Sequence, residues 1–373
     1  MEEKKVPALR FRGFDNAWEQ RRAKDIFVAF ADKGYPELPV LSATQDRGMI
    51  RRDENSINIH HDKKNEEGYK RVLPGQFVIH LRSFQGGFAH STIEGITSPA
   101  YIVFGFAESK DHCSEYWKYI FISETFIKRL ETVTYGIRDG RSISYDEFLT
   151  LSFVIPYQEE QIRIAQYLKK LDHLISLHQR KLEMLKKVKK SMLEKMFPKN
   201  DAKVPEVRFS DFTDAWEQRR LGEVVTITMG QSPDGATYSD SPSKYILVQG
   251  NADLKDGWVF PRVWTTQKTK VCDKGDLIMS VRAPAGAMGK TAYNAVIGRG
   301  VAAIKGNEFI YQRLVKMDLC DYWKKLAAGS TFESINSDII FNAEIAMPSG
   351  KEQKKIGSIF NKLDHLISLH QRK

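Results

Sequence analysis

A twelve-residue segment occurs twice without a single change, and this repeat constrains the fold of the chain more than any other feature. KLDHLISLHQRK spans residues 170–181 and returns at 362–373. The opening VPALRFRGFDNAWEQRR (6–22) likewise returns as VPEVRFSDFTDAWEQRR (204–220). Internal similarity on this scale indicates that one structural plan is built twice. We therefore expect two similar domains rather than one large domain.

Each copy has the same order: an opening segment, a long insert, a strand that ends in proline, and a helix. The run SISYDEFLTLSFVIPYQEEQ (142–161) aligns with SINSDIIFNAEIAMPSGKEQ (334–353). The inserts differ much more, although 75–90 and 275–290 share a leading glycine, an apolar run and an arginine. The constant frames therefore bind the same partner twice, or they exchange DNA by recombination, and both explanations stay open.

The inserts contain short apolar runs bounded by Gly, Pro, Asn and Asp, a pattern typical of strands. These runs are residues 76–81, 100–106, 245–249 and 276–281. We expect short helices near 114–132 and 308–328. Regular alternation of strand and helix is missing, which argues against a doubly wound parallel sheet. The inserts are thus predicted to be mixed α/β modules.

A long helix follows the first insert, since Glu159 to Phe197 contains no Pro or Gly and Pro198 ends it. Residues at heptad spacing form an apolar seam that His178 and Lys189 interrupt, and its apolar members are Leu168, Leu171, Ile175, Leu182, Leu185, Met192 and Met196. A helix of this length spans about 58 Å. The second copy begins near Lys351 and has Leu363 and Ile367 on its seam. Two such helices packed antiparallel are expected to hold the two modules at a fixed distance.

The composition favours a polyanionic partner, because the formal net charge is +10. The cysteines Cys113, Cys272 and Cys320 lie far apart, which argues against a disulfide framework and against a zinc cluster. There is neither a leader with an apolar core nor an apolar run long enough for a bilayer. We expect a soluble, cytoplasmic protein with no metal site.

Two divergent modules on a rigid spacer are suited to reading DNA. If each module reads a few base pairs, the pair reads a split sequence with an unread gap, and different inserts make that target asymmetric. One duplex turn is about 34 Å, so the predicted spacer can place the readers at least one turn apart.

Several motifs together resemble the specificity (S) subunit of type I restriction–modification systems. They are the opening segment 204–220, GQSP (230–233), GDLIMSVRAPAGAMGKT (275–291) and the run 334–373. The resemblance covers essentially the whole chain in both copies. It implies that each insert is a target recognition domain and each helix a conserved spacer.

The resemblance also implies the partners and the chemistry. The chain would bind double-stranded DNA, recruit two methyltransferase (modification) subunits and, in the full complex, join restriction subunits. It would carry no active site and no cofactor. S-adenosylmethionine, ATP and Mg are expected on the partner subunits, and adenine methylation is expected of the complex.

The expected fold class is α+β, with two similar mixed α/β target recognition domains separated by long antiparallel coiled-coil spacer helices and related by a pseudo-two-fold internal repeat. The predicted boundaries are 1–155 for the first recognition domain with its opening segment, 156–200 for the first spacer helix, 201–350 for the second recognition domain and 351–373 for the second spacer helix. Family members usually continue past this point. We therefore expect a shortened second helix, as in a truncated product, a shuffled allele or an engineered fragment.

Polar residues in glycine-rich loops after strands are the candidate DNA contacts. In the first module they are Arg82, Ser83, Gln85, Arg138 and Arg141, and in the second Gln231, Ser232, Arg282, Lys290, Ser330 and Thr331. Arg and Gln suit guanine and adenine edges respectively. An exposed arginine can instead be solvated or bind phosphate. The matched pair Arg82 and Arg282 favours phosphate positioning, because it persists where the rest of the insert changes.

No catalytic residue is predicted. GKT (289–291) lacks the earlier glycine of a phosphate-binding loop, and GRGVAA (298–303) matches a loose G-x-G-x-x-A outside any strand–helix crossover. Two alternatives stay open: a self-contained DNA-modifying enzyme, and a stand-alone DNA-binding regulator.

Overall fold

The structure is a computed structural model, and it describes residues 7–44, 46–54, 63–80, 87–133, 144–199, 202–327 and 334–371. The chain divides into two compact units, residues 1–174 and 175–373. The division falls inside the longest helix of the described chain, α5 (Gln158–Lys195), so each unit contains one part of α5. None of the helices in the described ranges is long and apolar enough to cross a membrane.

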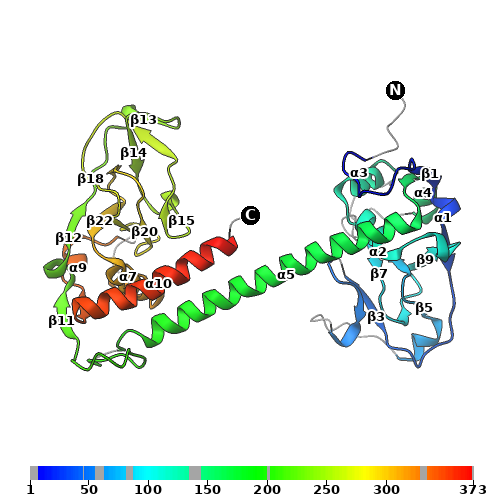
Figure 1. The fold of residues 1–373 in the computed structure, drawn as a ribbon, viewed down its shortest axis with the longest axis horizontal. Coiled ribbons are helices and arrows are strands. Elements are labelled where there is room, and N and C mark those ends of the chain that lie inside the picture. The colour runs from blue at the N-terminus through cyan, green and yellow to red at the C-terminus, as the bar shows by residue number, and fades with distance from the viewer. Residues whose placement is uncertain are drawn as a thin grey trace. The chain divides into compact units, whose positions relative to one another are not determined.

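The first unit is built from short strands and helices (Figure 1). Its elements before α5 are β1 (Glu19–Arg22), α1 (Ala23–Ile26), β2 (Phe27–Phe30), β3 (Leu41–Thr44), β4 (Gly48–Arg51), η1 (Arg52–Glu54), η2 (Lys63–Gly68), β5 (Lys70–Val72), β6 (Phe77–Ile79), β7 (Phe88–His90), β8 (Gly95–Thr97), β9 (Ile102–Phe106), η3 (Ser109–Asp111), α2 (Ser114–Phe121), α3 (Glu124–Val133), α4 (Tyr145–Thr150) and β10 (Ser152–Ile155).

The core of the first unit is aromatic. Strands β2, β9, β6 and β7 form an antiparallel sheet in that order, and Phe77 of β6 is the register partner of Phe104 of β9. Both rings are fully buried, together with Trp117 of α2 and Phe148 of α4. Burying large aromatic rings removes much apolar surface from water, so the helices pack on this sheet.

The second unit repeats these elements and adds others (Figure 1). Besides the end of α5 it contains β11 (Glu217–Arg220), α6 (Leu221–Val224), β12 (Thr226–Met229), η4 (Gly235–Thr237), β13 (Tyr238–Ser239), β14 (Tyr245–Val248), η5 (Asn251–Asp253), β15 (Leu254–Lys255), β16 (Trp258–Val259), β17 (Val263–Thr265), β18 (Val271–Cys272), β19 (Leu277–Ser280), β20 (Met288–Lys290), β21 (Ala295–Ile297), β22 (Val301–Lys305), α7 (Glu308–Leu319), α8 (Tyr322–Ala327), α9 (Ser337–Phe341), β23 (Glu344–Met347) and α10 (Gly350–Gln371).

The sheets of the two units have a common topology. In the second unit β12, β22, β19 and β20 lie in the order that β2, β9, β6 and β7 have in the first, and β16 and β15 extend the sheet to six strands. Leu277 pairs with Ile304 as Phe77 pairs with Phe104. A second sheet contains β13, β17, β14, β21 and β18. The α+β class and the internal repeat predicted from the sequence are confirmed.

The constant frames are held together by matching ion pairs. In the first unit Arg10 Nη2 lies 2.6 Å from Glu160 Oε2 and its Nε 2.8 Å from Oε1. In the second unit Arg208 makes the same two-pronged contact with Glu352, at 2.8 Å for both bonds. Each carboxylate is at most 3% exposed. The repeated opening segment is thereby fastened to the first turn of each long helix, which explains why both are constant.

The glutamine after each of these glutamates anchors the recognition domain to the frame. Gln161 donates to Pro156 O at 2.8 Å and accepts from Cys113 N, at the start of α2, at 3.0 Å. Gln353 donates to Pro348 O at 2.9 Å and accepts from the side chain of Asn307, the N-cap of α7. The motif Pro-x-x-x-Glu-Gln therefore joins the frame to the start of α2 or α7 inside each insert.

Within the second unit, α10 packs antiparallel on the end of α5 (Figure 1). His178 meets His370, whereas Lys189, further along α5, meets Asp364, earlier on α10. The sequence predicted α5 to reach Phe197, but it ends at Lys195. Phe197 leaves the helix because its ring is fully buried in the core, where Lys316 donates to its carbonyl oxygen.

Candidate nucleic-acid interface

Four turns of the second unit meet at one end of its six-stranded sheet, and we call them the turn cluster. They are residues 230–232, 249–251, 282–284 and 298–300. The first and third follow β12 and β19, which both pair antiparallel with β22, so they lie beside the turn that precedes β22. The second follows β14, which runs parallel to β21, the strand leading into 298–300.

Backbone hydrogen bonds join these turns directly. The donor and acceptor pairs are Gly230 N to Val301 O (3.0 Å), Gln231 N to Ile297 O (2.8 Å), Gly298 N to Val248 O (2.8 Å) and Val281 N to Gly300 O (2.9 Å). Paired backbone groups hold a loop in one conformation, because each broken bond would leave a polar group unsatisfied. The turn cluster is therefore a rigid platform.

Two of its glycines are required by close approach of the backbone. A Cβ atom on Gly300 would lie 2.0 Å from Gln249 O, and one on Gly230 would lie 2.1 Å from Gly298 O. Any side chain at either position would push two turns apart. The close packing of these turns therefore requires glycine at both positions.

The side chains on this platform suit DNA. Gln231, Arg282 and Arg299 are exposed, and Ser232 Oγ accepts a hydrogen bond of 3.1 Å from Arg299 N. Guanidinium groups bind phosphate oxygens or guanine edges with two parallel hydrogen bonds, and amides do the same for adenine. The predicted contacts Gln231, Ser232 and Arg282 are thus brought together, although they come from separate strands.

A buried carboxylate orients one edge of the cluster. Asp253 is 2% exposed and accepts from Gln249 N at 2.7 Å and Gly250 N at 3.2 Å. Its other oxygen accepts from Nε and Nη2 of Arg262, at 3.0 and 2.9 Å. The Arg262 side chain is 48% exposed, so part of its guanidinium faces solvent in a fixed orientation. Such preorganisation lowers the entropy lost when a ligand binds.

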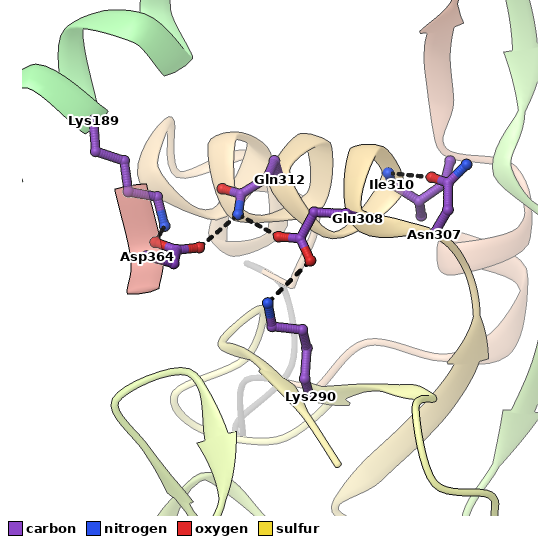
Figure 2. Close-up of polar contacts among 7 residues, drawn as sticks. All are labelled: Lys189, Lys290, Asn307, Glu308, Ile310, Gln312 and Asp364. Atoms are coloured by element: carbon purple, nitrogen blue, oxygen red, sulfur yellow. Dashed lines mark hydrogen bonds and ion pairs between the residues drawn. The ribbon is translucent and has the colours of Figure 1, made fainter. Parts of the chain in front are cut away.

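Lys290 lies elsewhere in the unit. It pairs with Leu277 at the start of β19, whereas Arg282 follows the end of that strand. Its ammonium is 3.0 Å from Glu308 (Figure 2). It also lies above the rings of Tyr311 and Trp258. A DNA contact by Lys290 would require this ion pair to open, and it stays a prediction.

Several predicted contacts lie outside the described residues. These are Arg82, Ser83, Gln85, Arg138 and Arg141 of the first module and Ser330 and Thr331 of the second. Their role in DNA binding stays a prediction.

The predicted helix seam is covered where α10 lies along α5. Leu185 and Met196 are buried, and Leu182, Leu363 and Ile367 are half-buried. Towards the start of α5, Leu168 is half-buried, whereas Leu171 and Ile175 are exposed.

Arg262 and Arg299 were not among the DNA contacts predicted from the sequence. Arg299 sits in GRG (298–300), which the sequence suggested only as part of a nucleotide-binding motif. A glycine on each side of an arginine, directly before a strand, was a usable signal for a tight turn presenting that side chain. Arg262 gave no such signal, because its partner Asp253 is identified by the fold alone.

This geometry defines a class of protein made of two related α+β domains, each of which contains part of one long helix. Residues 213–373 match the profile of the type I restriction modification DNA specificity domain. These residues thus carry the domain of the family that the sequence resembles, the specificity subunits of type I restriction–modification systems.

Curated relatives come from Methanocaldococcus jannaschii. The putative type I restriction enzyme MjaX specificity subunit is 30% identical over 62% of this chain and 56% of that relative. The MjaVIII specificity subunit is 23% identical over 60% of this chain and 58% of that relative. The chain thus spans a little more than half the length of the curated relatives it matches.

Solved structures share the fold along nearly the whole chain. The S subunit of a type I restriction–modification system from M. genitalium has a TM-score of 0.61 and 14% identity, over 99% of this chain and 94% of that one. A chain from a structural study of the assembly and conformational transition of a type I R-M system has a TM-score of 0.56 and 19% identity, over 97% and 93% of the two chains.

Proposed function

We propose that this chain is the DNA recognition and assembly subunit of a type I restriction–modification complex and reads an asymmetric, bipartite target. The observation that carries the proposal is the turn cluster: Gln231, Arg282 and Arg299 project from one rigid platform in a DNA specificity domain. The two halves of the target are read by the two recognition domains.

The asymmetry of the target follows from the turns. In the second unit the turn before β22 contains Arg299, whereas in the first unit the corresponding turn before β9 is Ser98-Pro99-Ala100. The strands around both turns have the same order. One framework thus presents different side chains, and different side chains select different base pairs.

The unread gap is set by α5. This helix is unbroken over 38 residues and belongs at its two ends to different units. A helix of that length extends about 57 Å. The antiparallel contact with α10 stiffens its second half.

Catalysis is performed by other polypeptides. Two methyltransferase subunits dock on the two equivalent frames, and restriction subunits join for cleavage. S-adenosylmethionine, ATP and Mg act on those partners. The duplicated ion pairs Arg10–Glu160 and Arg208–Glu352 support this part of the proposal, because they give each frame the same local geometry.

Methyl transfer from labelled S-adenosylmethionine to DNA tests the proposal. The chain alone should transfer no methyl group, and adding a cognate methyltransferase subunit should produce methylation at a split target. Methyl transfer by the purified chain alone would establish the rival enzyme. DNA binding without any stable complex with a methyltransferase would instead favour a stand-alone regulator.

A further inference from the structure

A continuous network of polar side chains links the second recognition domain to both long helices (Figure 2). Lys290 of β20 donates to Glu308 Oε2 at 3.0 Å, and Glu308 Oε1 accepts from Gln312 Nε2 at 2.8 Å. The same nitrogen donates to Asp364 Oδ2 of α10, also at 2.8 Å. Asp364 Oδ1 is 2.5 Å from Lys189 Nζ of α5. This polar network thus runs from the sheet through α7 to α10 and α5.

The centre of this network is buried, whereas the carboxylates of Glu308 and Asp364 are 23% and 25% exposed. Gln312 is fully buried, and both N–H groups of its amide have an acidic acceptor. Lys290 and Lys189 are 12% and 18% exposed. The two ammonium groups balance the carboxylates of Glu308 and Asp364. Hydrogen bonds to charged groups in such surroundings are stronger than exposed ion pairs and hold their geometry more firmly.

The first unit contains the same link in a different form. Asp172 is the counterpart of Asp364, since both are the aspartate of the repeated KLDHLI segment. Its Oδ2 accepts from the hydroxyl of Tyr119, on α2, at 2.7 Å. α2 and α7 are the first α-helices after the matching strands β9 and β22. One constant aspartate therefore accepts from a donor that each insert supplies in its own way.

We propose that Asp172 and Asp364 are positioning residues that fix the orientation of each recognition domain on its long helix. The inference rests on the proposed function. It adds a rule for exchangeable inserts: whatever bases an insert reads, its first helix must present a hydrogen-bond donor to this aspartate. Tyr119 and Gln312 are two solutions to that requirement.

The link matters because a split target is read only when both domains face their half-sites together. Lys290 and Arg282 flank the same β19–β20 pair. A domain that rocks about α7 therefore moves the turn cluster across the DNA. Loss of the link should leave each domain folded and able to bind, but should relax the requirement for one gap length.

The test uses the chain in complex with its methyltransferase subunits and three DNA targets, with the native gap, one base pair fewer and one more. Gln312→Leu removes the hydrogen bond to Asp364, and Tyr119→Phe removes the hydrogen bond to Asp172. Each should lower the preference for the native gap about tenfold, the effect of losing a hydrogen bond to a charged group. Glu183→Ala is the control, because it removes an exposed α5 ion pair with Lys186, and it should keep the preference of the unaltered chain.

A second measurement separates positioning from folding. Spin labels at Lys268→Cys, in an exposed loop of the recognition domain, and Lys187→Cys, on α5, with Cys320→Ser to remove an exposed thiol, report the distance between domain and helix. The distribution of that distance should broaden about twofold in Gln312→Leu, because cutting the link releases side-chain and domain motion. An unchanged gap preference in both Gln312→Leu and Tyr119→Phe would overturn the inference. If the unaltered chain directs no methylation to any split target, the proposed function fails instead.

Discussion

His178 and His370 face each other with their Nδ1 atoms 3.0 Å apart. They occupy the same place in the two copies of the repeated segment, so a residue of one copy meets its own counterpart. Two identical segments that cross at the same residue in antiparallel helices define a local two-fold axis between α5 and α10. At this contact the two identical segments therefore bind each other.

The histidine pair makes this helix contact sensitive to pH. Two ring nitrogens at this distance hold one proton between them, so a further proton taken up by His370 breaks the contact. Desolvation, followed by the charges of Lys181 and His178, lowers the pKa of His370. The folded state thus binds fewer protons than the unfolded one, and its stability falls as the pH drops below about 6.5. The protection factors of the amides in the last turns of α10, which are corrected for the pH dependence of intrinsic exchange, should be lower at pH 5.5 than at pH 7.5. His370→Gln should lose this difference, and equal protection factors at both pH values in the unaltered chain would contradict the expectation.

Removing one partner of a frame ion pair should be costly. Arg208→Met leaves the carboxylate of Glu352, which is 1% exposed, without its cation. We expect the free energy of unfolding of the second unit to fall by about 3 kcal/mol, as for other buried pairs broken on one side. Urea unfolding measures this. Adding Glu352→Gln should restore part of the loss, whereas Arg219→Met, at a 44% exposed position, should have little effect.

Arginines of the turn cluster should contribute to DNA affinity. Arg282→Ala and Arg299→Ala should each weaken binding, and removing one phosphate-bound arginine should lower the slope of log affinity against log salt by about one. Arg82→Ala should resemble Arg282→Ala, with little change in sequence preference. Lys274→Ala is the matched control, because Lys274 is exposed before β19, at the opposite end from Arg282. Equal slopes for all four variants would argue against DNA binding at the cluster.

Lengthening α5 should lengthen the unread gap. Seven helix-forming residues inserted between Leu174 and Ile175 leave the Tyr119–Asp172 and His178–His370 contacts intact. They add about 10.5 Å and rotate the helix face by about 20°. Methylation mapping should then show a gap about three base pairs longer, at 3.4 Å per base pair. A five-residue insertion turns the face by about 140° and should abolish methylation. An unchanged gap in the seven-residue variant would refute the role of α5 as a spacer.

The sequence predicted the features that depend on neighbouring residues. The span of α5 follows from the absence of Pro and Gly and from Pro198, and the structure places its ends within two residues of the prediction. Strands β6, β9, β14 and β19 fall inside the apolar runs that were predicted to be strands. Local propensity and periodicity decide such elements, so they are readable without a fold.

The tertiary structure decided what meets across long separations in the chain. The fold places Lys290 beside Glu308, a partner that the sequence did not predict, and Arg262 gains its orientation from a buried Asp253. The turn cluster joins four segments between residues 230 and 300 through strand pairing and through hydrogen bonds between the turns. Whether a charged side chain faces DNA, an ion-pair partner or water depends on which strands become neighbours and on what they bury. That choice is made by the free energy of the whole core, which no local stretch of sequence contains.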